Sequence, residues 1–225
     1  TTVRASVGNY LIGKKIAELG EDIVIMNGDG ADEVMGGYLY MKKAPDAIEF
    51  DLECRRLIEN IHHFDVLRSD RCISTHGLEP RTPFLDKGFV QTYLSIPADV
   101  RFTSTRDKQE KYLLRRAIDD VWPSLLPKSV LWRQKEAFSD GVSSNTKPWF
   151  EIINENLSDS DECYHGDTEH NPPVTMEQRH YRAIFSRLYP DREGIIPYFW
   201  MPRFVDASDC SARTLEIYTD KNKSS

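Results

Sequence analysis

A short apolar run that leads directly into a glycine-rich turn is the feature that most constrains the fold of this chain. Ile23-Val24-Ile25-Met26 is followed without a break by Asn27-Gly28-Asp29-Gly30. A run of four apolar residues bounded by turn residues is typical of a strand that is buried on both faces. Residues 31–40 then have helical character, interrupted by Gly36 and Gly37. The segment therefore predicts a buried strand, a tight turn and the start of a helix, as in α/β proteins.

The rest of the chain predicts mainly helices. Apolar spacing and capping residues place helices at 5–19, 46–62, 64–76, 86–96, 107–122 and 176–188. Pro80 and Pro83 break the regular pattern in their region. Residues 128–144 show little periodicity, and a long loop in a compact domain is often functional. The sequence thus predicts an α/β chain that is mostly helical and has few strands.

Composition limits the class of protein. With 225 residues, 40% of them hydrophobic and 29% charged, the chain can bury a core and is expected to be soluble and globular. Its net charge of −7 argues against a nucleic-acid backbone as the main partner. We expect no transmembrane helix and no signal peptide, because no long apolar run and no basic leader occur. The four cysteines lack metal-binding spacing, which predicts free thiols and a cytoplasmic location.

The glycine-rich turn has the chemistry of a site for an anion and a metal ion. Glycines allow a ligand to approach the backbone closely, and the start of a helix offers free N–H groups. Asp29, Asp32 and Glu33 would repel a phosphate unless a cation lies between them. Mg²⁺ is usually held by one or two carboxylates together with phosphate oxygens. The alternative is a tight turn whose acidic residues only stabilise the helix that follows.

Two other charged stretches have a chemical and a structural interpretation. Residues 132–141 carry Arg133 and Lys135 between aromatic residues, and a lysine can stabilise a pyrophosphate leaving group as a point charge. The alternative is a solvated charge cluster. Residues 68–86 alternate arginines with acidic residues, which indicates a structural network of ion pairs. Asp65, one turn before Arg68, is a candidate partner in that network.

Six motifs occur in an order that resembles one known family. They are Thr1-Thr2-Val3-Arg4-Ala5-Ser6, Gly28-x-Gly30-x-Asp32-Glu33 with Gly36-Gly37-Tyr38-x-Tyr40, Lys43-Ala44-Pro45, Arg81-x-Pro83-Phe84-Leu85-Asp86, Trp132-Arg133-x-Lys135-Glu136-x-Phe138-Ser139-Asp140-Gly141 and Ala207-Ser208-Asp209-x-Ser211-Ala212-Arg213-Thr214. The resemblance that they carry covers nearly the whole chain. They resemble the synthetase domain of glutamine-dependent asparagine synthetases, of the eukaryotic type.

The resemblance implies both a fold and an activity. Residues 1–225 would be the C-terminal portion of an adenine-nucleotide alpha-hydrolase-like (ATP-pyrophosphatase) domain. In that family, ATP and Mg²⁺ serve to adenylate the side chain of aspartate. Ammonia from an N-terminal glutaminase domain then displaces AMP from the β-aspartyl-AMP intermediate to give asparagine. The resemblance also allows a homodimer.

The resemblance assigns a role to each matching residue. Asn27 and Gly28 fall where the family contacts ATP. Asp29 falls at the acidic residue that is important for forming β-aspartyl-AMP. Asp32 falls at a Mg²⁺ ligand, and Lys135 falls at the lysine that stabilises developing charge during adenylation. We therefore expect the turn and the lysine to meet in one nucleotide pocket.

The chain departs from the family within the turn. The family has Ser-Gly-Glu-Gly-Ser-Asp, whereas here Asn27, Asp29 and Ala31 replace Ser, Glu and Ser. Aspartate is one methylene shorter than glutamate, and a misplacement of about 1 Å can cost ~10²-fold in rate. We therefore expect the substitution at position 29 to lower the rate without abolishing binding.

The chain also opens at a motif that follows the family's pyrophosphate loop and glutaminase domain. We therefore expect this polypeptide alone not to synthesise asparagine. Two alternatives stay open. One is a related amide-forming synthetase, such as a β-lactam-forming one, but those enzymes carry Tyr where Asp29 stands. The other is a non-catalytic remnant or a subunit of a split synthetase.

Overall fold

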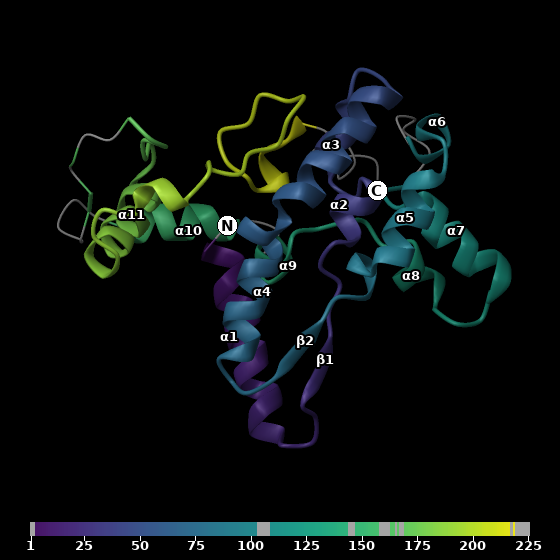
Figure 1. Cartoon of the computed structure of the whole chain (residues 1–225), viewed down its shortest axis with the longest axis horizontal. Helices are drawn as coiled ribbons and strands as arrows, with labels where there is room; N and C mark the ends of the chain where they lie inside the picture. The colour runs from purple at the N-terminus through teal and green to yellow at the C-terminus, as the bar shows by residue number, and fades with distance from the viewer. Residues whose placement is uncertain are drawn as a thin grey trace.

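A computed structural model describes residues 3–102, 109–143, 147–157, 163, 164, 166, 169–216 and 218 (Figure 1). The strands are β1 (Val24–Met26) and β2 (Glu79–Arg81). The α-helices are α1 (Val3–Leu19), α2 (Ala31–Met35), α3 (Ala47–Asn60), α4 (Asp65–Ser74), α5 (Lys87–Ser95), α6 (Ala98–Arg101), α7 (Tyr112–Val121), α8 (Lys128–Leu131), α9 (Phe138–Gly141), α10 (Trp149–Asn156) and α11 (Met176–Leu188). The described chain is therefore mostly helical with a small parallel sheet, consistent with an α/β fold. No described helix meets the length and apolarity that a membrane crossing requires.

The sheet has two parallel strands, with Ile25 of β1 opposite Pro80 of β2. The register is extended by a hydrogen bond of 2.8 Å from the backbone N–H of Asn27 to the carbonyl of Arg81. β2 was not predicted, because its central residue is a proline. Proline lacks an N–H group and is tolerated in a strand at the edge of a sheet. The pairing fixes the point at which β1 ends and the glycine-rich turn begins.

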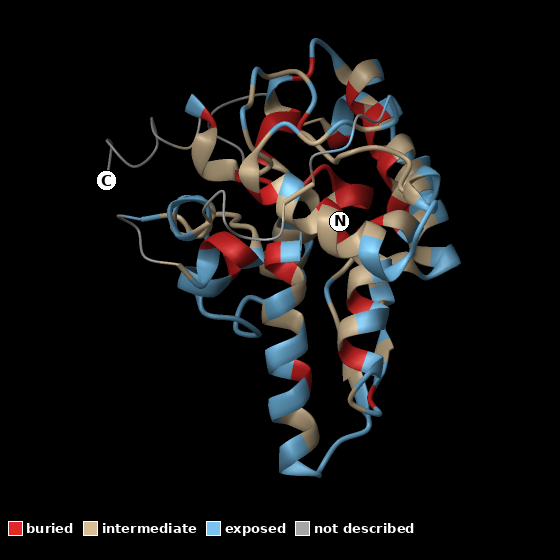
Figure 2. Cartoon of the chain, turned by 90° about the vertical axis from the view of Figure 1, so that its left-hand side faces the viewer, coloured by how far each residue is buried: buried red, intermediate tan, exposed pale blue. Residues whose placement is uncertain are grey.

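The predicted strand is present, but the prediction that it is buried on both faces is wrong for the described chain. Ile23 is 70% exposed and Met26 is 68% exposed. Among the described residues β1 pairs only with β2, so no larger sheet surrounds it. Figure 2 shows that the protruding end formed by α1 and the two strands is largely exposed, whereas buried residues gather in the body of the molecule.

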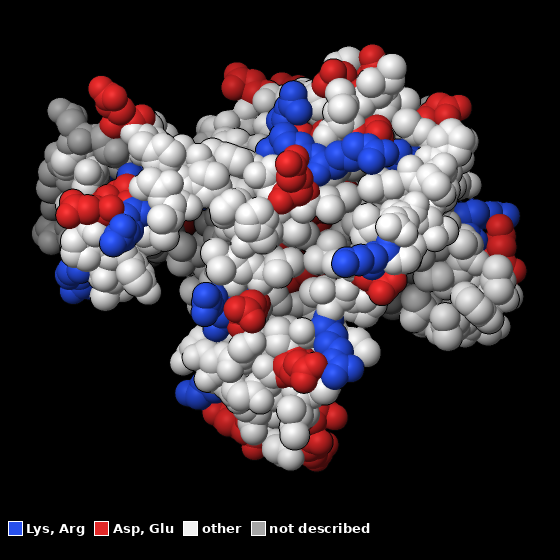
Figure 3. Space-filling model, viewed as in Figure 1, with Lys and Arg blue, Asp and Glu red and all other residues white. Residues whose placement is uncertain are grey.

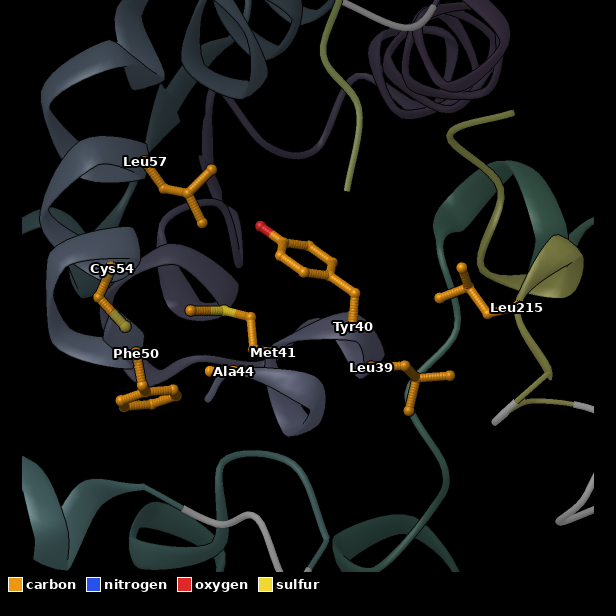
Figure 4. Close-up of a cluster of buried hydrophobic side chains, with 8 residues drawn as sticks. All are labelled: Leu39, Tyr40, Met41, Ala44, Phe50, Cys54, Leu57 and Leu215. Atoms are coloured by element: carbon orange, nitrogen blue, oxygen red, sulfur yellow. The ribbon is translucent and has the colours of Figure 1, made fainter. Parts of the chain in front are cut away.

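The core of the body is built around residues 31–57. One cluster consists of Leu39, Tyr40, Met41, Ala44, Phe50, Cys54, Leu57 and Leu215 (Figure 4). A second cluster consists of Ala31, Val34, Met35 and Tyr93. Leu215 comes from the C-terminal part of the chain and packs against residues more than half the chain away. The helix that follows the turn thus supplies most of the second cluster, and the first cluster begins just after it in the chain.

Most predicted helices are confirmed within a few residues. The Asp46 carboxylate caps α3 by accepting hydrogen bonds of 2.9 Å from the N–H groups of Ile48 and Glu49. The predicted helix at 31–40 is shorter than expected, because Gly36 adopts a φ of +61° and ends α2 at Met35. Of the helix predicted at 107–122, residues 107 and 108 lie outside the described residues, and α7 covers 112–121.

The long loop predicted at 128–144 contains two helices of four residues each, α8 and α9. Its last residue, 144, lies outside the described residues. Between the two helices, residues 132–137 have no regular secondary structure. Figure 3 shows acidic and basic side chains interspersed on one face of the molecule, so the net negative charge is not concentrated there.

Candidate functional site

The glycine-rich turn opens onto a cavity of about 1010 Å³. Its walls come from the turn and α2, the start of α4, the loop around Lys135 and the C-terminal part of the chain. Gly28, Asp29, Asp32 and Lys135 line the cavity. Four of the five residues predicted to form the site are therefore on its wall. The fifth, Asn27, is not on the wall, but its side chain is hydrogen-bonded to Asp29, which is.

Asn27 fixes the position of Asp29 through its side-chain amide. Its Oδ1 accepts a hydrogen bond of 2.6 Å from the backbone N–H of Asp29, and its Nδ2 donates one of 3.0 Å to Asp29 Oδ2. The Nδ2 atom also donates to the hydroxyl of the buried Ser69. Two of the residues that depart from the family's turn thus contact each other directly.

Lys135 and Asp32 meet in the cavity. The Lys135 Nζ lies 3.2 Å from Asp32 Oδ2, and the Nζ of Lys111 lies 2.8 Å from Asp32 Oδ1. Burial alone would raise the pKa of Asp32, but the two ammonium groups outweigh burial and hold that pKa below its usual value. The expected meeting of the turn and the lysine is therefore present, with Lys111 as a second cation that the sequence did not predict.

Two further groups hold the Lys135 ammonium. It donates a hydrogen bond of 3.0 Å to the carbonyl of Glu136, and it lies 5.3 Å from the centre of the Tyr38 ring. A cation over an aromatic face is stabilised by the electron density of the ring. The Lys135 side chain is only 15% exposed, so these contacts act in a partly dehydrated environment.

The glycine next to Tyr38 leaves room for the Asp32 carboxylate. A Cβ atom added at Gly37 would overlap Asp32 Oδ1 and crowd the Lys111 side chain. At the preceding residue, Gly36, a Cβ atom would overlap the Phe50 ring instead. The two adjacent glycines therefore serve different purposes, one in the site and one in the core.

The fit of the site to a metal ion depends on Asp32. No group of three or more His, Cys, Asp or Glu side chains in the described part of the chain is arranged to hold a metal. Asp32 Oδ1 is buried and has no well-formed hydrogen bond, although the Lys111 ammonium is close. One buried carboxylate oxygen of this kind fits Mg²⁺ only when phosphate oxygens and water complete the coordination.

An arginine lies between two carboxylates on the other side of the turn. The Arg68 Nη2 is 2.5 Å from Asp65 Oδ1 and 3.7 Å from Asp29 Oδ1. Burial raises the pKa of Asp29 and outweighs the opposing effect of the Arg68 charge. The predicted pairing of Asp65 with Arg68 is confirmed. Both residues also line the cavity, which the sequence did not predict.

Glu33 is a buried carboxyl group on the same wall. It is 3% exposed, and the Tyr38 hydroxyl donates a hydrogen bond to it. Burial, reinforced by the charges of Asp65 and Asp32, raises the pKa of Glu33 to about 8. The sequence placed Tyr38 in a motif directly after Gly36 and Gly37 but gave it no role.

The raised pKa of Glu33 predicts a pH-dependent stability. Between about 4.5, its ordinary value, and about 8, the folded chain keeps a proton that the unfolded chain has lost. The free energy of unfolding therefore falls as the pH rises through this range, by ~1.4 kcal/mol per unit. We expect Glu33→Gln to remove most of the fall between pH 6 and pH 8 in urea denaturation. The exposed Glu59→Gln is the control, and an unchanged fall in Glu33→Gln would contradict the assignment.

Comparisons with known proteins match this chain to one family. The sequence model of the asparagine synthase family matches residues 43–202. The chain is 47% identical over 223 residues to the glutamine-hydrolysing asparagine synthetase of Gallus gallus. It is 44% identical to those of Mus musculus, over 228 residues, and Homo sapiens, over 223 residues. These matches cover 97–99% of the chain but only 39–40% of the length of each relative.

Proposed function

Because this chain belongs to the asparagine synthase family, we propose that it forms the nucleotide-binding and aspartate-binding part of an ATP-dependent ligase that makes asparagine. In the proposed reaction the β-carboxylate of aspartate attacks the α-phosphate of ATP and releases pyrophosphate. Ammonia obtained from glutamine then displaces AMP from β-aspartyl-AMP. The chain spans about two fifths of its relatives, so the complete reaction is proposed for a protein that also contains the pyrophosphate loop and the glutaminase.

The observation that supports the proposal best is the meeting of Lys135 with Asp32 in the cavity, at 3.2 Å. Attack of a carboxylate on a phosphate brings two anions together, and a fixed cation lowers the energy of that transition state. Lys135 comes from a loop that is distant from the turn in the sequence, and its ammonium lies beside Asp32 at the start of α2. We assign Lys135 as the catalytic residue that stabilises the charge on the leaving pyrophosphate.

The turn supplies the nucleotide side of the proposed site. Gly28 is exposed on the cavity wall, and a Cβ atom there would contact nothing in the protein within 4 Å. The position thus leaves space for the close approach of a nucleotide, while Asn27 holds the turn rigid. Asp32 would hold Mg²⁺ together with phosphate oxygens, and Mg²⁺ would neutralise charge on the phosphates.

The aspartate side is assigned to the group around Arg68. The guanidinium of Arg68 can bind the α-carboxylate of the substrate, because guanidinium and carboxylate groups match in shape and charge. Asp29 and Asp65 can accept hydrogen bonds from its α-ammonium group. An acidic Asp29 favours an aspartate enzyme over a β-lactam-forming synthetase, in which a tyrosine stands at this position.

The proposal is tested by isotope exchange. The chain is joined to the remaining part of the Gallus gallus relative, and incorporation of labelled pyrophosphate into ATP is measured. We expect exchange that requires both aspartate and Mg²⁺ and that glutamate does not support, because its longer arm moves the attacking carboxylate by about 1 Å. Exchange without aspartate, or nucleotide binding with no exchange at all, would overturn the proposal and would favour a non-catalytic role.

We also propose that the protein is located in the cytoplasm. The four cysteines are free thiols, which is in keeping with the cytoplasm, where thiols stay reduced. We also propose a homodimer, to be measured by light scattering after size-exclusion chromatography.

A further inference from the structure

The C-terminal part of the chain crosses the loop that carries Lys135. We define residues 209–216 and 218 as the C-terminal strap and residues 133–143 as the lysine loop. In Figure 4, Leu215 of the strap lies beside Leu39 of the core cluster. Leu215 is 4% exposed, so its side chain anchors the strap in the core. The strap is therefore a fixed part of the fold where it meets the lysine loop.

A second anchor ties the strap to α1. The guanidinium of Arg4 donates a hydrogen bond of 2.6 Å to Asp209 Oδ2, and its Nε lies 3.1 Å from Glu177 Oε1 at the start of α11. The Arg4 and Glu177 side chains are each 7% exposed. Buried ion pairs of this kind are costly to break, because one charge would be left without a partner. The strap is thus held at both Asp209 and Leu215, independently of the lysine loop.

From this fixed position Arg213 holds the lysine loop at three points. Its Nη2 donates to the carbonyl of Asp140 at 2.7 Å, and its Nη1 donates to the hydroxyl of Ser143 at 3.1 Å. The same Nη2 lies 3.7 Å from Glu136 Oε1. The Arg213 side chain is 5% exposed, so water does not compete strongly for these contacts.

Tyr218 and Ser211 hold the loop from either side of Arg213. The Tyr218 hydroxyl donates a hydrogen bond of 2.6 Å to Glu136 Oε1, and the Ser211 hydroxyl donates one of 2.8 Å to Asp140 Oδ1. Glu136 directly follows Lys135, and its carbonyl accepts the hydrogen bond from the Lys135 ammonium. The position of Glu136 therefore determines where the lysine points.

We propose that Arg213 and Tyr218 are positioning residues that hold the lysine loop so that the Lys135 ammonium faces Asp32. The proposal rests on the proposed function of Lys135. Tyr218 lines the cavity and Arg213 does not, and the contacts through which we propose that they act are those with Glu136 and Asp140. The C-terminal strap is thereby a functional part of the site rather than a passive tail.

The first test measures loop order without any reaction. Trypsin cuts after lysine, and cleavage between Lys135 and Glu136 requires the loop to leave its place. In the chain joined to the remaining part of the Gallus gallus relative, we expect Tyr218→Phe to speed this cleavage about tenfold, the effect of losing a hydrogen bond to a charged group. The exposed Tyr189→Phe is the matched control. Mass spectrometry identifies the bond that is cut.

The second test separates positioning from binding. We expect Tyr218→Phe to lower the kcat of aspartate-dependent pyrophosphate exchange about tenfold and to leave the KM for aspartate unchanged. Arg213→Ala should have a larger effect, and Arg213→Lys should recover part of the rate. Thermal unfolding of each variant shows whether the fold is intact. Tyr218→Phe removes only a hydroxyl and keeps the test informative if Arg213→Ala does not fold.

The outcomes distinguish this inference from the proposed function. Faster cleavage together with a lower kcat supports the inference. Unchanged cleavage in a folded Tyr218→Phe variant overturns it, and so does faster cleavage with an unchanged kcat. If Lys135→Ala itself exchanges pyrophosphate normally, the proposed role of Lys135 fails, and with it the functional part of the inference. Trypsin cleavage then decides only whether the strap orders the loop.

Discussion

Lys135→Ala is expected to lower aspartate-dependent exchange of pyrophosphate into ATP by about 10²–10³-fold, the loss seen when one charge-stabilising donor is removed from a transition state. The ammonium lies 3.2 Å from Asp32 and is only 15% exposed, so water cannot replace it efficiently. The measurement uses the chain joined to the remaining part of the Gallus gallus relative. The KM for ATP should change much less than kcat, because the role proposed for Lys135 is to stabilise the transition state rather than to bind ATP.

The control for this variant is Lys147→Ala. Lys147 is 46% exposed and forms an ion pair with Glu155 away from the cavity, so its loss should leave exchange unchanged. Equal rates for Lys135→Ala and the unaltered protein would remove Lys135 from the mechanism. A folded Lys135→Ala variant that no longer binds ATP would also contradict the assignment, because it would make the lysine a binding residue.

Gly30→Ala is expected to destabilise the chain by about 2–4 kcal/mol, since strain in the backbone and overpacking each cost ~1–3 kcal/mol. Gly30 has a φ of +90°, a conformation that side chains disfavour. An added Cβ atom would also overlap the Leu85 side chain. Urea denaturation measures the loss.

Gly28→Ala, in the same turn, is the matched control for Gly30→Ala. Its added Cβ atom meets no protein atom within 4 Å, so the free energy of unfolding should change by less than ~0.5 kcal/mol. Nucleotide affinity should nevertheless fall if Gly28 lies against ATP as proposed. Equal stability losses at the two positions would contradict the geometry of the turn.

The sequence was informative about the fold wherever local signals decide the structure. The Asp46 cap and the regular apolar spacing predicted α3, and the same reasoning predicted α1, α4, α5 and α11. β2 could not be predicted in this way, because Pro80 lies in a strand only through its pairing with β1, far away in the chain. How exposed β1 is also depends on which elements pack against it, and a run of four apolar residues does not specify those elements.

The candidate site shows the same division between local and distant signals. The motifs predicted the turn and Lys135, but not which residues they contact. Tyr38 occurs in a motif that gave no sign of its contact with Lys135, and Lys111, which pairs with Asp32, occurs in no motif. Asn27 and Asp29 looked like two separate departures from the family. Their direct hydrogen bonds show that they form one unit, in which the amide holds the shorter carboxylate.

The two neighbouring glycines after α2 limit the substitutions that this sequence can accept during evolution. A substitution at Gly36 is opposed by the Phe50 ring, and one at Gly37 is opposed by the Asp32 carboxylate. Mutation at the first position would be selected against through the amount of folded protein in the cell. Under the proposed function, mutation at the second would be selected against through lower catalytic activity, because it would displace the Asp32 carboxylate. The two neighbouring glycines would thus be under two different selective pressures.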